Sequence, residues 1–231
     1  ILAFTFKKYR IFMFNFSLLK PLPEYLVQRY YGWKATTFAN NKSWYHKLAE
    51  DGQHPRAMII SCCDSRVHVT SIFGSDAGEF FIHRNIANLV PPFKEDQDYH
   101  GTSAAIEYAV KTLKIPHIIV LGHSTCGGVH SSFEYFSGNN PNLYKDSNFV
   151  ASWLEILRPS FEKIPSNLSK NEKLKSLEKN TVLTSLENLT TFPFIKEAIN
   201  NETLSLHGLW HDIGTGDLMF YDNKSSKFIL V

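Results

Sequence analysis

The sequence reads His117-Ile-Ile-Val-Leu-Gly122 near its middle, an apolar run of the length of a buried β-strand, with Pro116 at its start. Residues 102–113 before it are rich in alanine and carry apolar side chains at helical spacing. Further upstream, Glu79-Phe-Phe-Ile-His83 is a second strand candidate. Strand, helix and strand in succession are typical of a parallel sheet, in which helices connect neighbouring strands.

The same pattern continues in both directions along the chain. Ala57-Met-Ile-Ile-Ser-Cys62 predicts a further strand, and Gly214-Thr-Gly216 predicts a hairpin turn between strands at 204–213 and 218–221. We therefore expect an α/β fold with a mainly parallel central sheet, flanking helices, an antiparallel edge strand and an N-terminal helical arm. Helices are predicted at 22–31, 36–49, from 128 to 136, 147–162, 168–189 and 194–199, and residues 137–141 are predicted to form a loop.

Composition narrows the functional classes. The 231 residues include 24 basic and 22 acidic side chains, a net charge of +2, which does not favour nucleic acid or a membrane as a partner. The three cysteines Cys62, Cys63 and Cys126 are too few for a disulfide framework. They indicate a reducing compartment, and we expect a cytoplasmic protein.

The first residues resemble neither a signal peptide nor a membrane span, because Lys7, Lys8 and Arg10 interrupt their apolar run. We hypothesise that residues 1–12 are upstream sequence that is not native. The predicted division is an N-terminal segment and helical arm at 1–50 and a catalytic domain at 51–231.

Three metal-binding side chains stand at strand ends. Cys62 closes one predicted strand, and His123 and Cys126 follow another. The spacing of His123 and Cys126 alone could be incidental. If the two strands are neighbours, however, all three side chains meet where parallel sheets bind ligands. Two thiolates and one imidazole suit zinc, and three protein ligands leave a fourth position for water, as in catalytic zinc sites.

Asp64 and Arg66 follow the first of these ligands directly. An Asp–Arg pair is often a simple ion pair, but this one would lie close to the metal. Arg66 would keep Asp64 ionised, and Asp64 would accept a hydrogen bond from zinc-bound hydroxide. Without Arg66, Asp64 could become the fourth metal ligand and close the site.

Cys62-Cys-Asp-Ser-Arg-Val67 and His123-Ser-Thr-Cys-Gly-Gly128 together resemble the paired signature of the plant-like β-class carbonic anhydrases. Residues 81–90, 104–110 and 206–216 resemble further blocks of that family, and the similarity runs from about residue 22 to residue 221. The resemblance implies one zinc ion per subunit and reversible hydration of carbon dioxide to bicarbonate and a proton. Zinc-bound hydroxide would attack, with Asp64 and Arg66 as the catalytic dyad that orients it.

The resemblance also implies a substrate pocket. Gln53 would hydrogen-bond the substrate and, with the region of Gly127, steady the developing oxyanion. In the family a narrow apolar pocket forms between two subunits, so a homodimer, or a dimer-based oligomer such as a tetramer, is implied. The positions that match the pocket lining are Phe81, Ile86 and Tyr108.

The chain departs from the family pattern at three positions. Cys63 replaces Ser, Ala or Val and is expected to be a buried bystander. Thr112 replaces a histidine thought to relay protons, so the proton shuttle stays unassigned among His68, His83, His100 and His130. Ile59 stands where members regulated by non-catalytic bicarbonate have tryptophan, so we expect the open-site form.

The same residues could also serve other enzyme activities or a non-catalytic role. Hydrolysis of carbon disulfide or carbonyl sulfide could use the same metal site, and a structural zinc module or shell-building scaffold could carry it in degenerate form. A thiol phosphatase needs five residues between its cysteine and arginine, whereas Cys62 and Arg66 have three between them. Residues 122–128 lack the G-x-x-x-x-G-K-[ST] pattern of a nucleotide-binding loop.

Overall fold

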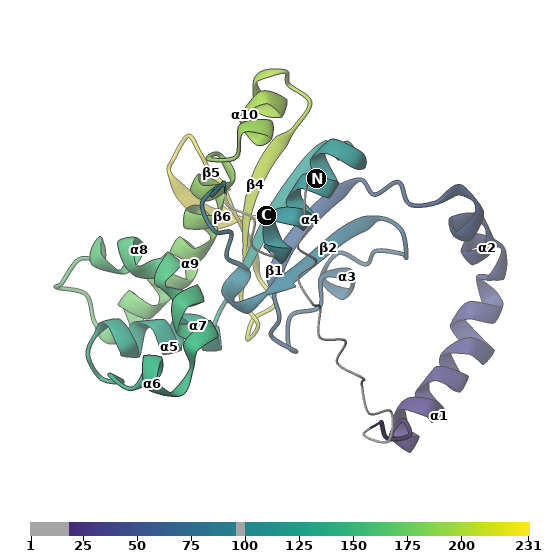
Figure 1. Ribbon diagram of the computed structural model, residues 1–231, viewed down its shortest axis with the longest axis horizontal. Coiled ribbons are helices and arrows are strands. Elements are labelled where there is room, and N and C mark those ends of the chain that lie inside the picture. Colours follow the sequence, from purple (N-terminus) through teal and green to yellow (C-terminus); the bar gives the residue numbers. More distant parts are fainter. Residues whose placement is uncertain (1–18, 96–99) are drawn as a thin grey trace, which may run out of the picture. The chain divides into compact units, whose positions relative to one another are not determined.

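The computed structural model describes residues 19–95 and 100–231, and the hypothesis about residues 1–12 lies outside them (Figure 1). The chain forms two compact units, residues 1–52 and 53–231, which are described separately. The assignment of catalysis to residues 51–231 stays a prediction.

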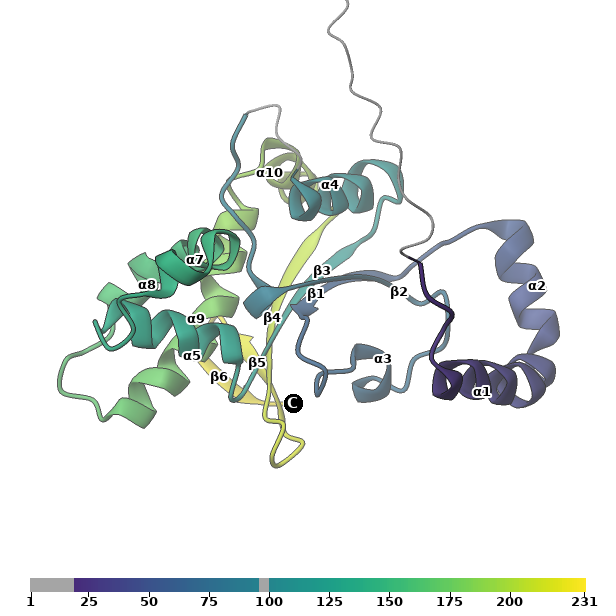
Figure 2. The same cartoon turned by 60° about the horizontal axis from the view of Figure 1, so that its bottom comes forward.

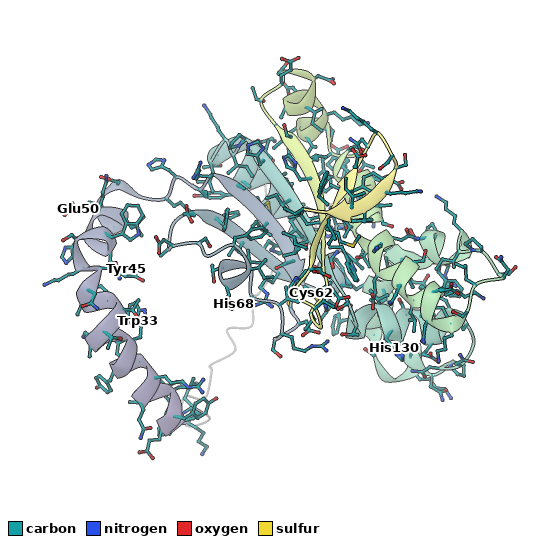
Figure 3. All side chains as sticks on the ribbon, turned by 180° about the vertical axis from the view of Figure 1, so that it is seen from behind. Trp33, Tyr45, Glu50, Cys62, His68 and His130 are labelled. Atoms are coloured by element: carbon teal, nitrogen blue, oxygen red, sulfur yellow. The ribbon has the colours of Figure 1, made fainter. Side chains whose placement is uncertain are left out.

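The first unit is helical from residue 24 onward. Helix α1 (Glu24–Trp33) continues through a π-helical turn, η2 (Lys34–Phe38), and α2 (Lys42–Asp51) follows. The two predicted N-terminal helices are thus confirmed, with bounds shifted by a few residues. The ring of Trp33 contacts those of Phe38 and Tyr45, with centroids 5.5 and 5.7 Å apart (Figure 3). These ring contacts hold the two helices of the unit together.

The second unit is built on a six-stranded sheet with strand order β2-β1-β3-β4-β5-β6. The first four strands in this order are parallel, and the last two are antiparallel to their neighbours. The predicted fold class is confirmed. The strands are β1 (Ala57–Cys62), β2 (Phe80–Asn85), β3 (His117–His123), β4 (Ser205–His211), β5 (Leu218–Asp222) and β6 (Lys227–Leu230).

The antiparallel edge has two strands where the sequence predicted one. A turn after β5, in which Ser225 donates its backbone N–H to Asp222 at 2.9 Å, leads into β6. Strand β6 has four residues and only Phe228 is half-buried. So short and exposed a segment carries no alternating hydrophobic pattern, and for that reason the sequence did not reveal it.

Eleven helical segments connect or follow the strands in the described part of this unit. The predicted helix at 147–162 is broken into three segments, with Pro159 at the start of the last. The short α3 and α6 were not predicted. The segments are α3 (Val69–Ile72), η3 (Ile86–Asn88), α4 (Gly101–Glu107), η4 (Tyr108–Thr112), α5 (Gly127–Phe136), α6 (Leu143–Asp146), α7 (Asn148–Leu154), η5 (Glu155–Leu157), α8 (Arg158–Glu162), α9 (Lys170–Leu189) and α10 (Pro193–Asn200).

Helices cover both faces of the sheet. Met58 and Ile60 of β1 point into a core cluster shared with α4, α9 and α10. Ile59, between them in sequence, points into a cluster on the other face with Val67 and Val69. Figure 2 shows α3 on the opposite face of the sheet from α4 and α10. Among the described residues, no helix is both long enough and apolar enough to cross a bilayer.

Helix α9 lies very close to β3. A Cβ atom built on Gly122 would come within 2.7 Å of Val182 Cγ2, a distance that real Cβ contacts essentially never show. Glycine at this position therefore lets α9 pack closely against the end of β3. Glu178 lies one turn earlier on α9. Its backbone carbonyl oxygen is 3.5 Å from the Cβ atom built on Gly122, so the close approach also brings Glu178 to the end of β3.

Candidate metal centre

Two neighbouring strand ends bring together the three predicted ligands. Strands β1 and β3 pair directly, with Ser61 opposite Leu121, so Cys62 and His123 emerge at the same edge of the sheet. Cys126 lies at the N-cap of α5. The ligand atoms of the three residues all lie within 4.8 Å of one another, and all three side chains are buried. Figure 3 shows Cys62 at this end of the strands.

The geometry fits a tetrahedral metal. The sulfur atoms of Cys62 and Cys126 are 3.9 Å apart. Two thiolates each about 2.3 Å from a tetrahedral zinc ion lie roughly 3.8 Å apart. The sulfur pair therefore already has the spacing that zinc requires.

The imidazole of His123 is oriented for metal binding. Its Nδ1 lies 2.9 Å from the carbonyl oxygen of Ser124, and because a carbonyl only accepts, Nδ1 must carry the proton. The lone pair is then on Nε2, which is buried and has no hydrogen-bond partner among the described residues. An unpartnered buried nitrogen is costly unless it binds something, and a metal-ligating histidine commonly has this arrangement.

The two thiols are electrostatically coupled. The hydrogen bond shared with Cys126 lowers the pKa of Cys62 to about 4 despite its burial. The same shared hydrogen bond, together with burial, raises the pKa of Cys126. A divalent cation bound by both sulfurs would stabilise both of them as thiolates.

A glycine allows the start of α5 to pack against η3. A Cβ atom built on Gly128 would lie 2.8 Å from Ile86 Cγ2 and 3.3 Å from the side chain of Ala87. This close packing places Ile86, a predicted pocket residue, beside the ligand turn. Gly127, the other predicted residue of this region, directly follows Cys126 and begins α5.

Asp64 and Arg66 form a bidentate ion pair next to the ligands. Arg66 Nε donates to Asp64 Oδ1 at 2.9 Å, and Arg66 Nη2 donates to Oδ2 at 2.7 Å. The backbone N–H of Arg66 adds a third bond to Oδ1 at 3.0 Å. These hydrogen bonds hold the pKa of Asp64 well below its usual range. Asp64 is therefore ionised, and Arg66 binds both of its oxygens.

A second arginine, which the sequence analysis missed, shapes the loop between Cys62 and Val67. Arg84 of β2 donates to the carbonyl oxygens of Cys62 at 2.8 Å, Asp64 at 2.7 Å and Val67 at 2.8 Å. Little in the sequence pointed to this role, because Arg84 stands among the polar residues that end β2, between His83 and Asn85. Its three bonds fix the loop that carries Asp64.

The remaining predicted pocket residues lie elsewhere on this chain. Phe81 pairs with Met58, near the start of β1, and its ring packs against Tyr108 with centroids 5.9 Å apart. Gln53 precedes β1, and the strand alone separates Ala57 from Cys62 by about 16 Å at 3.3 Å per residue. Within one chain, the structure does not bring Gln53, Phe81 and Tyr108 to the metal ligands.

A cavity of about 800 Å³ borders the ligand turn. It is lined by Arg66, Thr125 and Cys126 on one side and by side chains of α5 and α9, including His130, on the other. The cavity gives solvent a route to the side of the turn that faces α9.

Cys63 is exposed, so the prediction of a buried residue is wrong. Strand β1 ends at Cys62, and the backbone N–H of Cys63 then bonds to the carbonyl of Asn85 as the chain leaves the sheet. The chain therefore turns its Cys63 side chain toward solvent.

The four histidines considered for proton transfer have different settings. His68 bonds to Ser71 and Thr70 at the start of α3, and Nε2 of the half-buried His83 lies 3.0 Å from Thr102 Oγ1. His100 precedes α4, and His130 is exposed at the cavity. The proton shuttle remains unassigned.

Comparison with known proteins connects this centre to characterised sequences. A family model described as carbonic anhydrase matches residues 57–218, which include all three ligands. Beta carbonic anhydrase 3 of Arabidopsis thaliana is 33% identical over 198 residues, covering 84% of this chain and 75% of that protein.

Solved structures agree with this result. The β-carbonic anhydrase CcaA has a TM-score of 0.83 and 31% identity, over 90% of this chain and 91% of its own. A tetrameric β-carbonic anhydrase of Sordaria macrospora has a TM-score of 0.69 and 31% identity, over 85% and 95%. The Coccomyxa enzyme in complex with acetazolamide has a TM-score of 0.74 and 26% identity, over 86% of each chain.

Proposed function

Because the chain belongs to the β-carbonic anhydrase family, we propose that it hydrates carbon dioxide at a zinc ion held by Cys62, His123 and Cys126. The observation that carries the proposal is the buried Cys-His-Cys cluster with its unpartnered imidazole nitrogen. Three protein ligands leave one position for solvent, as a catalytic site requires.

Asp64 and Arg66 would supply the second part of the mechanism. The metal, when bound, supplies Lewis acidity that activates water as a nucleophile at neutral pH. Ionised Asp64 accepts a hydrogen bond from the attacking oxygen and orients its lone pair toward carbon dioxide. Arg66 keeps that carboxylate charged and in place through its two bonds. Backbone N–H groups around Gly127 would stabilise the negative charge that develops on the substrate.

We propose the open-site form of the enzyme. In that form Asp64 stays with Arg66 and does not bind the metal. Two features support it: Arg66 engages both Asp64 oxygens, and the buried Ile59 fills the position where regulated members carry tryptophan.

A second copy of the chain would complete the pocket. Ile86 and Gly127 lie by the ligands, whereas Gln53, Phe81 and Tyr108 lie toward the other end of β1. A two-fold dimer could bring the second group of one subunit to the metal of the other. We also propose a reducing, cytoplasmic location, because Cys62 and Cys126 must stay unoxidised to bind a metal.

The test measures zinc content and carbon dioxide hydration on the same samples. We expect one zinc per chain and rapid hydration for the wild type. Cys62→Ser should lose both, whereas Cys63→Ser, the matched control at the neighbouring exposed thiol, should keep both. Asp64→Asn should keep zinc and lose about 10²–10⁴-fold in kcat/KM. A zinc-replete wild type that leaves carbon dioxide unreacted would overturn the proposal and favour a scaffold.

A further inference from the structure

We infer that Glu178 is a positioning residue, which fixes the turn carrying Cys126 and the partner groups of Arg66. The inference rests on the proposed metal site. Glu178 lies in α9, far from the ligands in sequence, and the residue is only 7% exposed. Its Oε1 accepts the backbone N–H of Thr125 at 2.7 Å.

Thr125 has an unusual backbone conformation. Its φ of +54° lies in the left-handed region, which is unfavourable for a β-branched residue and persists only where the surroundings hold it. Glu178 binds the N–H of Thr125, and Arg66 binds its carbonyl oxygen at 3.0 Å and its hydroxyl at 3.2 Å. The turn is therefore held from two sides, by α9 and by the Asp64–Arg66 pair.

This arrangement couples two parts of the centre. Cys126 directly follows Thr125, so the backbone angle at Thr125 sets where the third sulfur lies relative to Cys62. The same residue supplies two of the acceptors that orient Arg66. A buried carboxylate is costly, and burial raises the pKa of Glu178 although its Oε1 accepts the backbone N–H of Thr125.

Other anchors of the turn act on different atoms. Ser124 Oγ accepts the N–H of Ile213 at 2.9 Å and lies 3.4 Å from Asp212, which fixes the residue next to His123. Among the residues that the structure describes, the side chain that accepts a hydrogen bond from the N–H of Thr125 is that of Glu178. Its loss should therefore affect Cys126 and Arg66 while the imidazole of His123 keeps its own support.

Two conservative variants separate position from charge. Glu178→Asp keeps the carboxylate but shortens the side chain by one methylene, so it should no longer reach Thr125. Glu178→Gln keeps the length and an acceptor oxygen but removes the charge. Glu187→Asp, at an exposed position of the same helix, is the matched control.

Zinc affinity is measured by chelator competition, and site geometry by the absorption bands of the cobalt(II)-substituted protein. We expect E178D to lose about 10- to 100-fold in zinc affinity or in kcat/KM, with shifted cobalt bands, as for other residues that support metal ligands. E178Q should recover most of the affinity and the wild-type bands, and E187D should match the wild type.

The outcomes distinguish this inference from the proposed function. If the wild type binds no zinc, the proposed function fails and the inference with it. If the wild type is active and E178D has wild-type affinity, activity and spectrum, the inference alone is wrong. If E178Q is as impaired as E178D, hydrogen-bond acceptance at the right distance does not explain the role of Glu178.

Discussion

Single contacts decide the protonation states at and near the centre. The Ser124 carbonyl fixes the proton of His123 on Nδ1, and the bidentate contact with Arg66 keeps Asp64 ionised. His83 shows the same principle away from the ligands. Burial lowers its pKa, because the charged imidazolium would lose solvation beside Thr102.

His83 should therefore make stability depend on pH. A histidine with a lowered folded-state pKa stays neutral in the folded protein while the unfolded chain takes up a proton below about pH 6.5. Its contribution to stability is present above that pH and is lost as pH falls toward the folded-state pKa. We expect the free energy of unfolding, measured by urea titration between pH 7.5 and 5.5, to fall more steeply in the wild type than in His83→Gln. Parallel pH dependences of the two proteins would contradict this expectation.

The sequence revealed the residues whose chemistry is tied to strand ends. Cys62 and His123 could be placed together because parallel strands end at one edge of the sheet. Glu178 could not, because it lies in a helix rich in lysine and glutamate, and the sequence does not tell which of these charged side chains faces the core. Its burial follows from the close packing of α9 on β3. Lys179 of the same helix is likewise half-buried, with its nitrogen 5.0 Å from the centre of the Trp210 ring.

Among the contacts between elements, the one between α9 and β3 leaves the least room for a larger side chain. Gly122 admits α9 to a distance at which any added Cβ would meet Val182. That contact joins the strand carrying His123 to the helix carrying Glu178. The sequence predicted both elements, but a helix pattern cannot tell which strand it packs on or how closely.

Gly122→Ala should destabilise the protein by about 1–3 kcal/mol through overpacking. Val182→Ala should also destabilise it, because it leaves a cavity. The double variant should lose less than the sum of the two, since removal of the Val182 methyl groups makes room for the added Cβ. Urea unfolding of the four proteins gives the coupling free energy, and strict additivity would show that the two positions do not meet.

For the whole molecule, the separation of the predicted pocket residues is the main result. Ile86 and Gly127 accompany the ligands, and Gln53, Phe81 and Tyr108 do not. The resemblance to a family with a pocket between subunits gave this expectation, but sequence pattern alone could not say which residue belongs to which half.

A mixing experiment tests whether two copies share each pocket. Cys62→Ser abolishes the metal site, and Gln53→Ala removes the proposed substrate contact. In a two-fold dimer, random mixing after reversible dissociation should restore about a quarter of wild-type activity, because half of the dimers then contain one intact pocket of two. Sedimentation velocity confirms the assembly. Activity that stays at the level of the separate variants in mixed dimers would place both groups in one subunit.

The exposed Cys63 beside two shielded sulfurs offers a chemical handle on the protein. A thiol-specific reagent such as Ellman's should modify one group per native chain at once and three after denaturation. Stripping the centre with a chelator should speed the reaction of the other two. The colour change would follow metal loss in real time, and a dye attached at Cys63 would report events one residue from the centre.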